Sequence, residues 1–259
     1  MKVERQRAWR AVVAACLAFN ALAAGSATAA EFSLNPTRVH LDRARAIETL
    51  VLGNADQRPL SFEASVKRWT MAADGSWQLE PSDEVVVHPL VFTVQPGQQA
   101  RLRVGTLAPA VSAERAYRVE LQQLPTGGGD GVQVEVLTRL SVPVFVQPAA
   151  QPEPAPAAEA GLAAAALGAD GLQLTVANAG THYLPPQEAR LRLLDADGDT
   201  LRELPVTVGY VLAGARLPLP AQAVPAGACA RAARVELELP ETGATLAAAL
   251  PADPRACGG

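Results

Sequence analysis

The stretch VQVEVLTRLSVPVFVQP, residues 132–148, decides how the rest of the sequence is interpreted. Its even-numbered positions hold valine, threonine and leucine, and its odd-numbered positions begin polar and become apolar toward Phe145. An alternation with a period of two predicts a β-strand. Strands are usually ~5–6 residues long, and this stretch is about three times as long. A strand of this length would leave part of its apolar edge unpaired in its own domain.

Shorter strand-like runs lie on both sides of this stretch, and glycine, proline and aspartate turns separate them. They are FSLNPTRVHL (32–41), IETLVLGN (47–54), LSFEASVKRWTM (60–71), WQLE (77–80), DEVVVHPLVFTV (83–94), ARLRVGTL (100–107), AYRVELQQL (116–124), LQLTVANAG (172–180), ARLRLLDADGD (189–199), VTVGYVLAG (206–214) and ARVELELP (233–240). Their spacing is typical of a β-sandwich or a barrel. Amphipathic helical periodicity is missing, and residues 163–166, which have high helix propensity, are too few for a helix. The predicted fold class is all-β.

A proline- and alanine-rich segment divides the chain. Residues 149–161 show no hydrophobic periodicity and are typical of a stiff linker. The segment separates a first domain, residues 31–148, from a second, residues 162–259. Each is close to the ~100 residues of a common β-sandwich.

The first 30 residues have the pattern of a secretory signal peptide. Four basic residues precede an apolar run, and small residues follow it, which predicts cleavage near Ala29 or Ala30. The apolar run is shorter than the ~20 residues that a transmembrane helix requires. No later segment is apolar enough to span a bilayer, so we expect an exported protein without membrane insertion.

The charge and the cysteines agree with export. The chain has a net charge of −4, and residues 1–30 carry four positive charges and one negative charge, so the mature part carries −7. An acidic chain without basic clusters is not expected to bind nucleic acid. Of the three cysteines, Cys16 lies in the signal peptide. Cys229 and Cys257 remain, and a disulfide between them is the expected state in an oxidising compartment.

We find no pattern of catalytic or metal-binding residues. His40, His88 and His182 are far apart in the sequence and have no partner at metal-ligand spacing. The sequence contains no HExxH, GxSxG or Walker motif. The run DADGD (195–199) resembles a calcium loop but has Val206 where the bidentate glutamate belongs, so we interpret it as a turn. We expect no enzyme activity, no metal and no cofactor.

The long strand suggests a binding function. The glycine-rich loop before it allows the strand to extend, and Pro143 fits only an edge strand or a bulge. An exposed edge with alternating valines can pair with another chain by β-augmentation. The alternative is that these valines face only the core of their own domain.

The sequence resembles the periplasmic pilus-assembly chaperones of the PapD-like superfamily. It is most similar to the archaic branch, which serves subunits of the spore-coat-protein-U type. The segments that carry the resemblance are FSLNPTRVHLD (32–42), TLVLGNADQRPLSFEASVKRW (49–69), DGSWQLEPSDEVVVHPLVFTVQPGQQARLRV (74–104), AERAYRVELQQLP (113–125), RLSVPVFVQP (139–148), VANAG (176–180) and GYVLAG (209–214).

The resemblance implies two Ig-like β-sandwich domains arranged as a boomerang. It also implies that the protein stabilises pilin-like subunits in the periplasm by donor-strand complementation and delivers them to an outer-membrane usher. The donor residues would be Val132, Val134 and Val136, with Thr138 and Leu140 continuing the same face. An alternative from another class is an exported Ig-like structural or adhesive surface protein that keeps its strand for itself.

The family anchors the C-terminal carboxylate of the subunit with basic side chains between the two domains. Arg38 matches the family's arginine on the first strand, whereas the lysine expected on the donor strand is missing, because those positions hold Ser141 or Pro143. Arg139 is the proposed substitute, since a guanidinium binds a carboxylate through two hydrogen bonds. The alternative for Arg139 is an ordinary surface arginine, and Arg103 is a third candidate.

Overall fold

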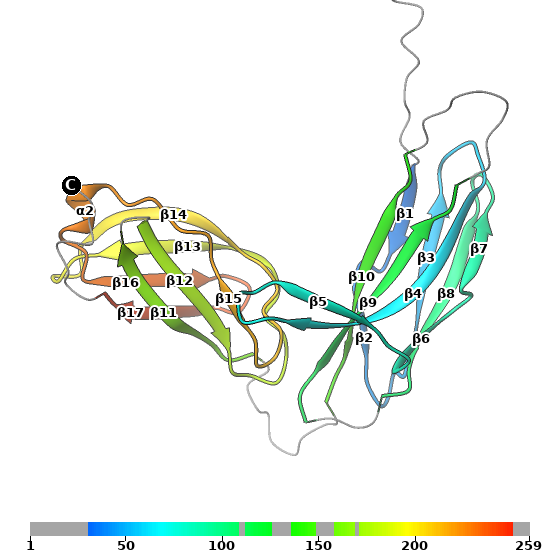
Figure 1. Cartoon of the computed structure of the whole chain (residues 1–259), viewed down its shortest axis with the longest axis horizontal. Coiled ribbons are helices and arrows are strands. Elements are labelled where there is room, and N and C mark those ends of the chain that lie inside the picture. The colour runs from blue at the N-terminus through cyan, green and yellow to red at the C-terminus, as the bar shows by residue number, and fades with distance from the viewer. Residues whose placement is uncertain (1–30, 109–111, 126–135, 149–157, 169–170, 251–259) are drawn as a thin grey trace, which may run out of the picture.

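The computed structural model describes residues 31–108, 112–125, 136–148, 158–168 and 171–250. These residues form two β-domains that meet at an angle, like the arms of a boomerang (Figure 1). Each domain is a sandwich of two sheets, which confirms the predicted fold class. The predicted signal peptide and most of the predicted linker lie outside the described residues, and the first strand of domain two begins within that linker, at Ala160.

Domain one pairs its strands almost entirely antiparallel. Its strands are β1 (Phe32–Asn35), β2 (Val39–Leu41), β3 (Ile47–Asn54), β4 (Leu60–Met71), β5 (Trp77–Pro81), β6 (Val85–His88), β7 (Val91–Val94), β8 (Gln99–Thr106), β9 (Arg115–Gln123) and β10 (Arg139–Val146). One sheet has the order β1-β3-β8-β6, and the other has the order β2-β10-β9-β4-β5, with β7 also paired to β4. The pair β10–β2 is parallel.

Domain two has a smaller sandwich. Its elements are β11 (Ala160–Gly168), β12 (Gly171–Asn178), β13 (Gln187–Leu194), β14 (Thr200–Val208), β15 (Arg216–Pro218), α2 (Ala226–Cys229), β16 (Arg234–Leu239) and β17 (Ala244–Ala249). The sheets have the orders β11-β12-β15 and β14-β13-β16-β17. Residues 163–166, which have high helix propensity, lie in β11, because the pairing of this strand with β12 outweighs their local preference.

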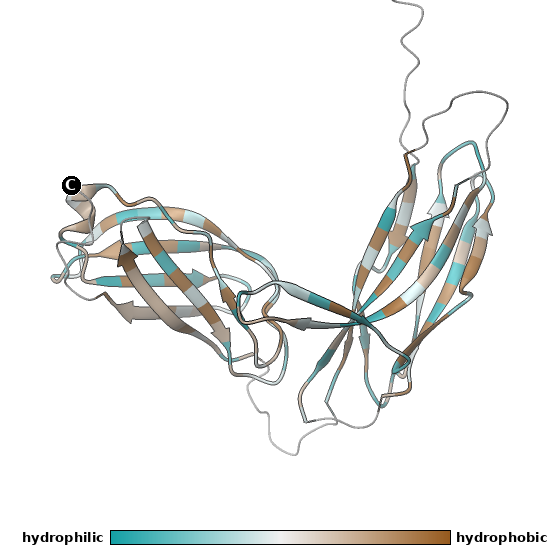
Figure 2. Cartoon of the chain, viewed as in Figure 1, coloured by the Kyte–Doolittle hydropathy of each residue, from teal (hydrophilic) through white to brown (hydrophobic). Residues whose placement is uncertain are grey.

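Each domain buries its own apolar core between its sheets. Apolar and polar residues alternate along most strands, so that one face of each sheet packs inward (Figure 2). Along β10, Val142, Val144 and Val146 face the core of domain one. A third cluster, around Trp69 and Phe145, lies between the two domains. The elbow of the molecule is therefore packed and apolar.

The strand β10 is shorter than the stretch of sequence that predicted it. It has eight residues and begins at Arg139, so the prediction of one continuous strand over 132–148 is wrong for residues 136–138. A segment becomes a strand only where a neighbour pairs with it, and the register between β10 and β9 ends at the pair Arg139–Gln122. At Pro143, β10 pairs with β9 but not yet with β2, which is the edge position that a proline requires.

The hairpin β4–β5 reaches across to domain two (Figure 1). Its turn contains Gly75 with a φ of +81°, close to Leu217 and Pro218 of domain two. On the same hairpin, the Met71 Sδ accepts a hydrogen bond of 3.5 Å from the backbone N–H of Leu212. The turn was expected from the sequence, but its role as a bridge between the domains was not.

The C-terminal part of domain two contains one helical turn, α2, that the sequence did not predict. It ends at Cys229, which is disulfide-bonded, and Cys257, its expected partner, lies outside the described residues. No helix in the described part of the chain is long and apolar enough to cross a membrane. The run at 195–199 forms the turn between β13 and β14, as predicted.

A buried asparagine fixes the end of a strand in domain one. The Nδ2 of Asn54 donates hydrogen bonds to the carbonyl oxygens of Arg58, at 2.8 Å, and Val94, at 2.9 Å. Its Oδ1 accepts a hydrogen bond of 2.8 Å from the N–H of Asp56. One side chain thus closes a turn and ties it to a distant strand.

Asn178 repeats this arrangement in domain two. Its Nδ2 donates to the carbonyl oxygens of His182, at 2.7 Å, and Val211, at 3.0 Å. Its Oδ1 accepts from the N–H groups of Glu159 and Gly180. The loop that Asn178 holds is the one that contacts domain one.

We expect Asn178→Ala to lower the free energy of unfolding by about 2–4 kcal/mol, because it leaves several buried backbone groups without partners. Urea unfolding followed by circular dichroism measures the change. Gln173→Ala, at an exposed position of the same strand, is the control and should change stability by less than about 0.5 kcal/mol. Equal stability of the two variants would contradict this role of Asn178.

Candidate functional site

Four neighbouring strands of domain one place three cations in one row on the outward face of their sheet. The register sets Pro143 of β10 opposite Arg118 of β9, and Arg118 opposite Lys67 of β4. Arg38 directly precedes β2, and the parallel pair Val39–Val144, extended back by one residue, sets it beside Pro143 on the other side. We call Arg38, Arg118 and Lys67 the cation row. It faces domain two rather than the core of domain one.

Arg118 is the most unusual member of the cation row. Only 4% of its surface is exposed, although it carries a full charge. Its guanidinium carbon lies 3.9 Å from the ring centre of Trp69 and 4.2 Å from that of Trp77, and the two indoles contact each other with 4.7 Å between ring centres, so the cation packs against both rings. Its Nη1 donates to the carbonyl of Ser141 at 3.3 Å, while its Nε and Nη2 are buried and have no hydrogen-bond partner among the described residues.

Arg118 has no carboxylate partner of its own among the described residues of this site. Burial lowers the pKa of Arg118, and the nearby Tyr210 and Glu120 partly oppose this effect. Glu120 forms its own ion pair with Lys67, with 2.8 Å between the Lys67 Nζ and a Glu120 Oε. Lys67 therefore neutralises the acid that would otherwise compensate Arg118. A buried cation with unused donors favours an anion that supplies acceptors.

Arg38 lies at the joint between the domains. Its Nη1 donates to the hydroxyl of Tyr183 at 2.9 Å, and its Nε is buried without a partner among the described residues. Its guanidinium carbon is 5.6 Å from the ring centre of Tyr210, and that of Arg118 is 5.7 Å from the same ring. The two guanidinium groups thus converge on one tyrosine of domain two, with the short Pro143 side chain between them.

Aromatic side chains hold this region together. Phe145 stacks on Tyr183 with 3.8 Å between ring centres, and Trp69 meets Tyr210 edge-to-face at 5.2 Å. Both contacts join domain one to domain two. The joint is therefore built from apolar rings, with Arg38 and Arg118 embedded among them.

This arrangement can bind one carboxylate. Two guanidinium groups with buried, unpaired N–H groups flank a small side chain, and a guanidinium binds a carboxylate through two parallel hydrogen bonds. Within the described residues, no three His, Cys, Asp or Glu side chains gather in a way that could hold a metal ion. The unpaired N–H groups of this region are suited to an anion.

The structure places the predicted anchor residues in different parts of the molecule. Arg139 is exposed, and its Nε donates to the Oε1 of Gln122 at 2.6 Å. It lies four positions from Pro143 along β10, which is about 13 Å in a strand. Arg103 is exposed on β8, in the opposite sheet, where it pairs with His88. Neither Arg139 nor Arg103 is brought to Arg38.

The predicted donor residues are described only in part. Val132 and Val134 lie outside the described residues. Val136 is 66% exposed, Thr138 is half-buried, and Leu140 packs against the core of its own domain. Of the predicted donor residues, Leu140 is therefore in contact with the core of domain one, and Val136 is exposed to solvent.

Sequence reasoning missed Arg118. In the run AYRVELQQL, the apolar alternation assigns Tyr117 and Val119 to the core and Arg118 to the opposite face, where an exposed arginine is normal. Its burial depends on rings that lie far away in the sequence. The one available signal was its place beside the position of the missing lysine, and that requires the register between β9 and β10.

The comparisons with known proteins identify the family. Residues 31–152 match the family of pili and flagellar-assembly chaperones, PapD N-terminal domain. Domain one of the chain belongs to the PapD-like pilus-assembly chaperones. Chaperones of this family are not enzymes, and they act in the periplasm of Gram-negative bacteria. A chaperone role for the chain follows from this membership.

Solved structures of pilus chaperones share the fold of both domains. A chain of the CsuC–CsuE chaperone–tip adhesion subunit complex, from the archaic Csu pili of Acinetobacter baumannii, matches with a TM-score of 0.58 at 16% identity. The match covers 85% of this chain and 98% of that chain. A chain of the Salmonella enterica SafA pilin–SafB chaperone complex matches with a TM-score of 0.57 at 18% identity, covering 87% and 99%. No curated protein matches significantly in sequence.

Proposed function

We propose that this PapD-like chaperone is exported to the periplasm and captures pilin-like subunits that lack their final strand. The segment Val132 to Leu140 would complete the subunit's sheet, with Val132, Val134 and Val136 inserted into its apolar groove and Thr138 continuing the contact. Leu140 marks the end of the lent segment, since it packs against the chaperone's own core.

The observation that carries this proposal is the continuity of one strand face. Val142, Val144 and Val146 face the core of domain one, and Val136 would lie on the same face if the strand extended through residues 136–138. On the N-terminal side of Leu140 the chain no longer packs against the core of domain one, and Val136 is 66% exposed. An exposed apolar edge is normally avoided, so its presence favours a partner strand.

The cation row supplies the second part of the proposal. We assign the anchor for the subunit's C-terminal carboxylate to Arg38 and Arg118, on either side of Pro143. The carboxylate would accept hydrogen bonds from the unpaired N–H groups of both arginines. Trp77, which is 50% exposed, covers Arg118 and would rotate aside as the subunit docks. Arg139 and Arg103 would remain surface arginines.

The partners belong to the same proposal. The resemblance of the sequence to the archaic branch suggests subunits of the spore-coat-protein-U type, and the fold is similar to a chain of an archaic chaperone–usher complex. Delivery to an outer-membrane usher would follow capture. A structural or adhesive protein, the alternative class, would not require free guanidinium N–H groups in the joint between its domains.

Co-expression with a candidate subunit tests the function. The chaperone should form a one-to-one complex with a subunit that lacks its final strand, measured by gel filtration of a periplasmic extract. The same subunit with a donor strand fused to its own C-terminus is the control and should not bind. Equal binding of both forms, or of neither, would contradict donor-strand capture.

A further inference from the structure

A carboxyl group lies in the joint between the two domains and takes no part in the cation row. Glu114, directly before β9, receives a hydrogen bond of 3.0 Å from the backbone N–H of Tyr183 to its Oε1. Its own backbone N–H donates to the carbonyl of Thr181 at 2.8 Å. Two hydrogen bonds therefore tie one residue of domain one to one loop of domain two.

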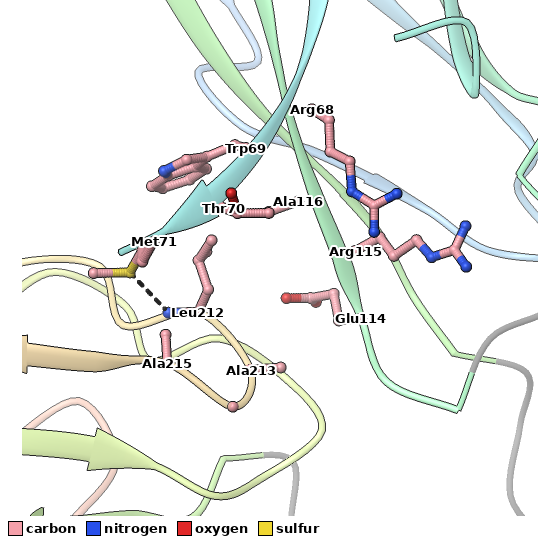
Figure 3. A pocket seen from close by; sticks show the side chains of 11 residues that line it. Arg68, Trp69, Thr70, Met71, Glu114, Arg115, Ala116, Leu212, Ala213 and Ala215 are labelled. Carbon is pink, nitrogen blue, oxygen red and sulfur yellow. Dashed lines mark hydrogen bonds between the residues drawn. The ribbon is translucent and has the colours of Figure 1, made fainter. Parts of the chain in front are cut away.

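The second carboxyl oxygen of Glu114 has no role in this connection. Its Oε2 is buried and has no hydrogen-bond partner among the described residues. Glu114 lines a pocket of about 230 Å³ between the domains, together with Ala116 and the loop that carries Leu212 and Ala213 (Figure 3). The carboxyl group points toward that loop, whereas Arg115 points away from it (Figure 3).

The charged groups around Glu114 are engaged elsewhere. Arg115 and Arg68, which line the same pocket, both form ion pairs with Glu84, at 2.7 Å and 3.4 Å. On the domain-two side, the hydroxyl of Tyr183 is bonded to Arg38, and the Nδ1 of His182 lies 3.1 Å from the hydroxyl of Thr181. No described cation forms a salt bridge with Glu114. An ionised Glu114 would be a buried anion without compensation.

We propose that Glu114 is a pH-sensitive latch that fixes the angle between the two domains when neutral and loosens it when ionised. The neutral group keeps the hydrogen bond from Tyr183 and leaves one uncharged O–H buried, which costs less than a buried charge. The carboxylate needs water around Oε2, and the adjoining pocket is the space through which water would enter as the domains separate. The inference concerns the chaperone frame itself and does not depend on subunit capture.

The titration range follows from the environment of the group. Burial raises the pKa of Glu114 to about 8, although the hydrogen bond from Tyr183 lowers it slightly. In the unfolded chain the pKa is near 4.5. Between these values the folded state binds more protons than the unfolded state, so the stabilisation by neutral Glu114 is complete below about pH 4.5 and is lost as pH rises through about 8.

Small-angle X-ray scattering of the mature protein from about pH 6 to about pH 9, on both sides of the pKa of Glu114, tests the latch. The wild-type radius of gyration should stay constant at the acidic end and increase as pH passes about 8. Glu114→Gln keeps the acceptor for Tyr183 and cannot ionise, so its radius of gyration should stay at the acidic value throughout. Glu63→Gln, which removes an exposed carboxyl, is the matched control and should behave like the wild type.

A second measurement does not depend on any variant. The amide signal of Tyr183 in nuclear magnetic resonance spectra of the wild type should shift with a midpoint near pH 8. A midpoint near 4.5 would overturn the proposal, because the carboxyl would then be ionised at all neutral pH values. Scattering that does not change with pH, or that changes equally in Glu114→Gln, would also overturn it.

Discussion

Arg118→Met is expected to weaken the capture of a strand-deficient subunit by about 2–5 kcal/mol, at least about 30-fold in affinity. The reason is that a bound carboxylate would lose a guanidinium partner in a dry site, where each remaining charge is left without compensation. Methionine keeps an unbranched apolar side chain that can pack beside Trp69 and Trp77, although it is shorter and loses the guanidinium contacts, so the domain should still fold. Titration calorimetry with the subunit's C-terminal segment, and co-purification with the whole subunit, measure the effect.

Arg103→Met is the matched control for this prediction. It removes the same charge from the same domain, but from an exposed position on the opposite sheet. Its affinity for the subunit should stay within about threefold of the wild type, as expected of a surface charge. If Arg118→Met binds as tightly as Arg103→Met, Arg118 is not part of the anchor, whereas donor-strand capture as such would remain intact.

Val136→Asp should abolish co-purification of the subunit, a loss of at least about 3 kcal/mol, because it places an unpaired carboxylate in an apolar groove. Val136 is already 66% exposed in the free chain, so the substitution should leave the stability of the chaperone unchanged. Co-expression with the subunit and thermal unfolding of the free variant together measure both expectations.

The control for Val136→Asp is its neighbour. Leu137 is also exposed, at 40%, but the two-residue period of a strand places it on the opposite face. Leu137→Asp should therefore reduce capture much less than Val136→Asp. Equal loss in both variants would mean that the segment does not bind as a strand.

Much of the architecture was predictable because β-strands carry a local signature. Alternating residues such as those of β12 and β16, and turn residues such as Gly75, predict strands and hairpins from local order alone. The failures occurred where pairing outweighs local preference. The alanines of β11 form a strand because β12 lies beside them. Residues 136–138 lie beyond the register between β9 and β10, although the N–H of Gln123 still donates to the carbonyl of Thr138.

The candidate site was predictable only in part. The first-strand arginine, Arg38, was identified through the resemblance, and the structure places it at the joint between the domains. The predicted substitute cation was Arg139, because it is near the missing lysine in the sequence. The structure instead sets Arg118 beside that position, because antiparallel pairing makes a residue on β9 a closer neighbour of Pro143 than one four positions along β10.

The sequence by itself determined the all-β class, the division into two domains and the apolar alternation that leads out of domain one, because each of these is written in local order along the chain. Only the tertiary structure decided which charged groups meet. The burial of Arg118 against Trp69 and Trp77, and the position of Glu114 against the loop of domain two, arise from strand register and domain packing. Register and packing bring together residues that are distant in sequence, and a local sequence pattern does not identify these contact partners.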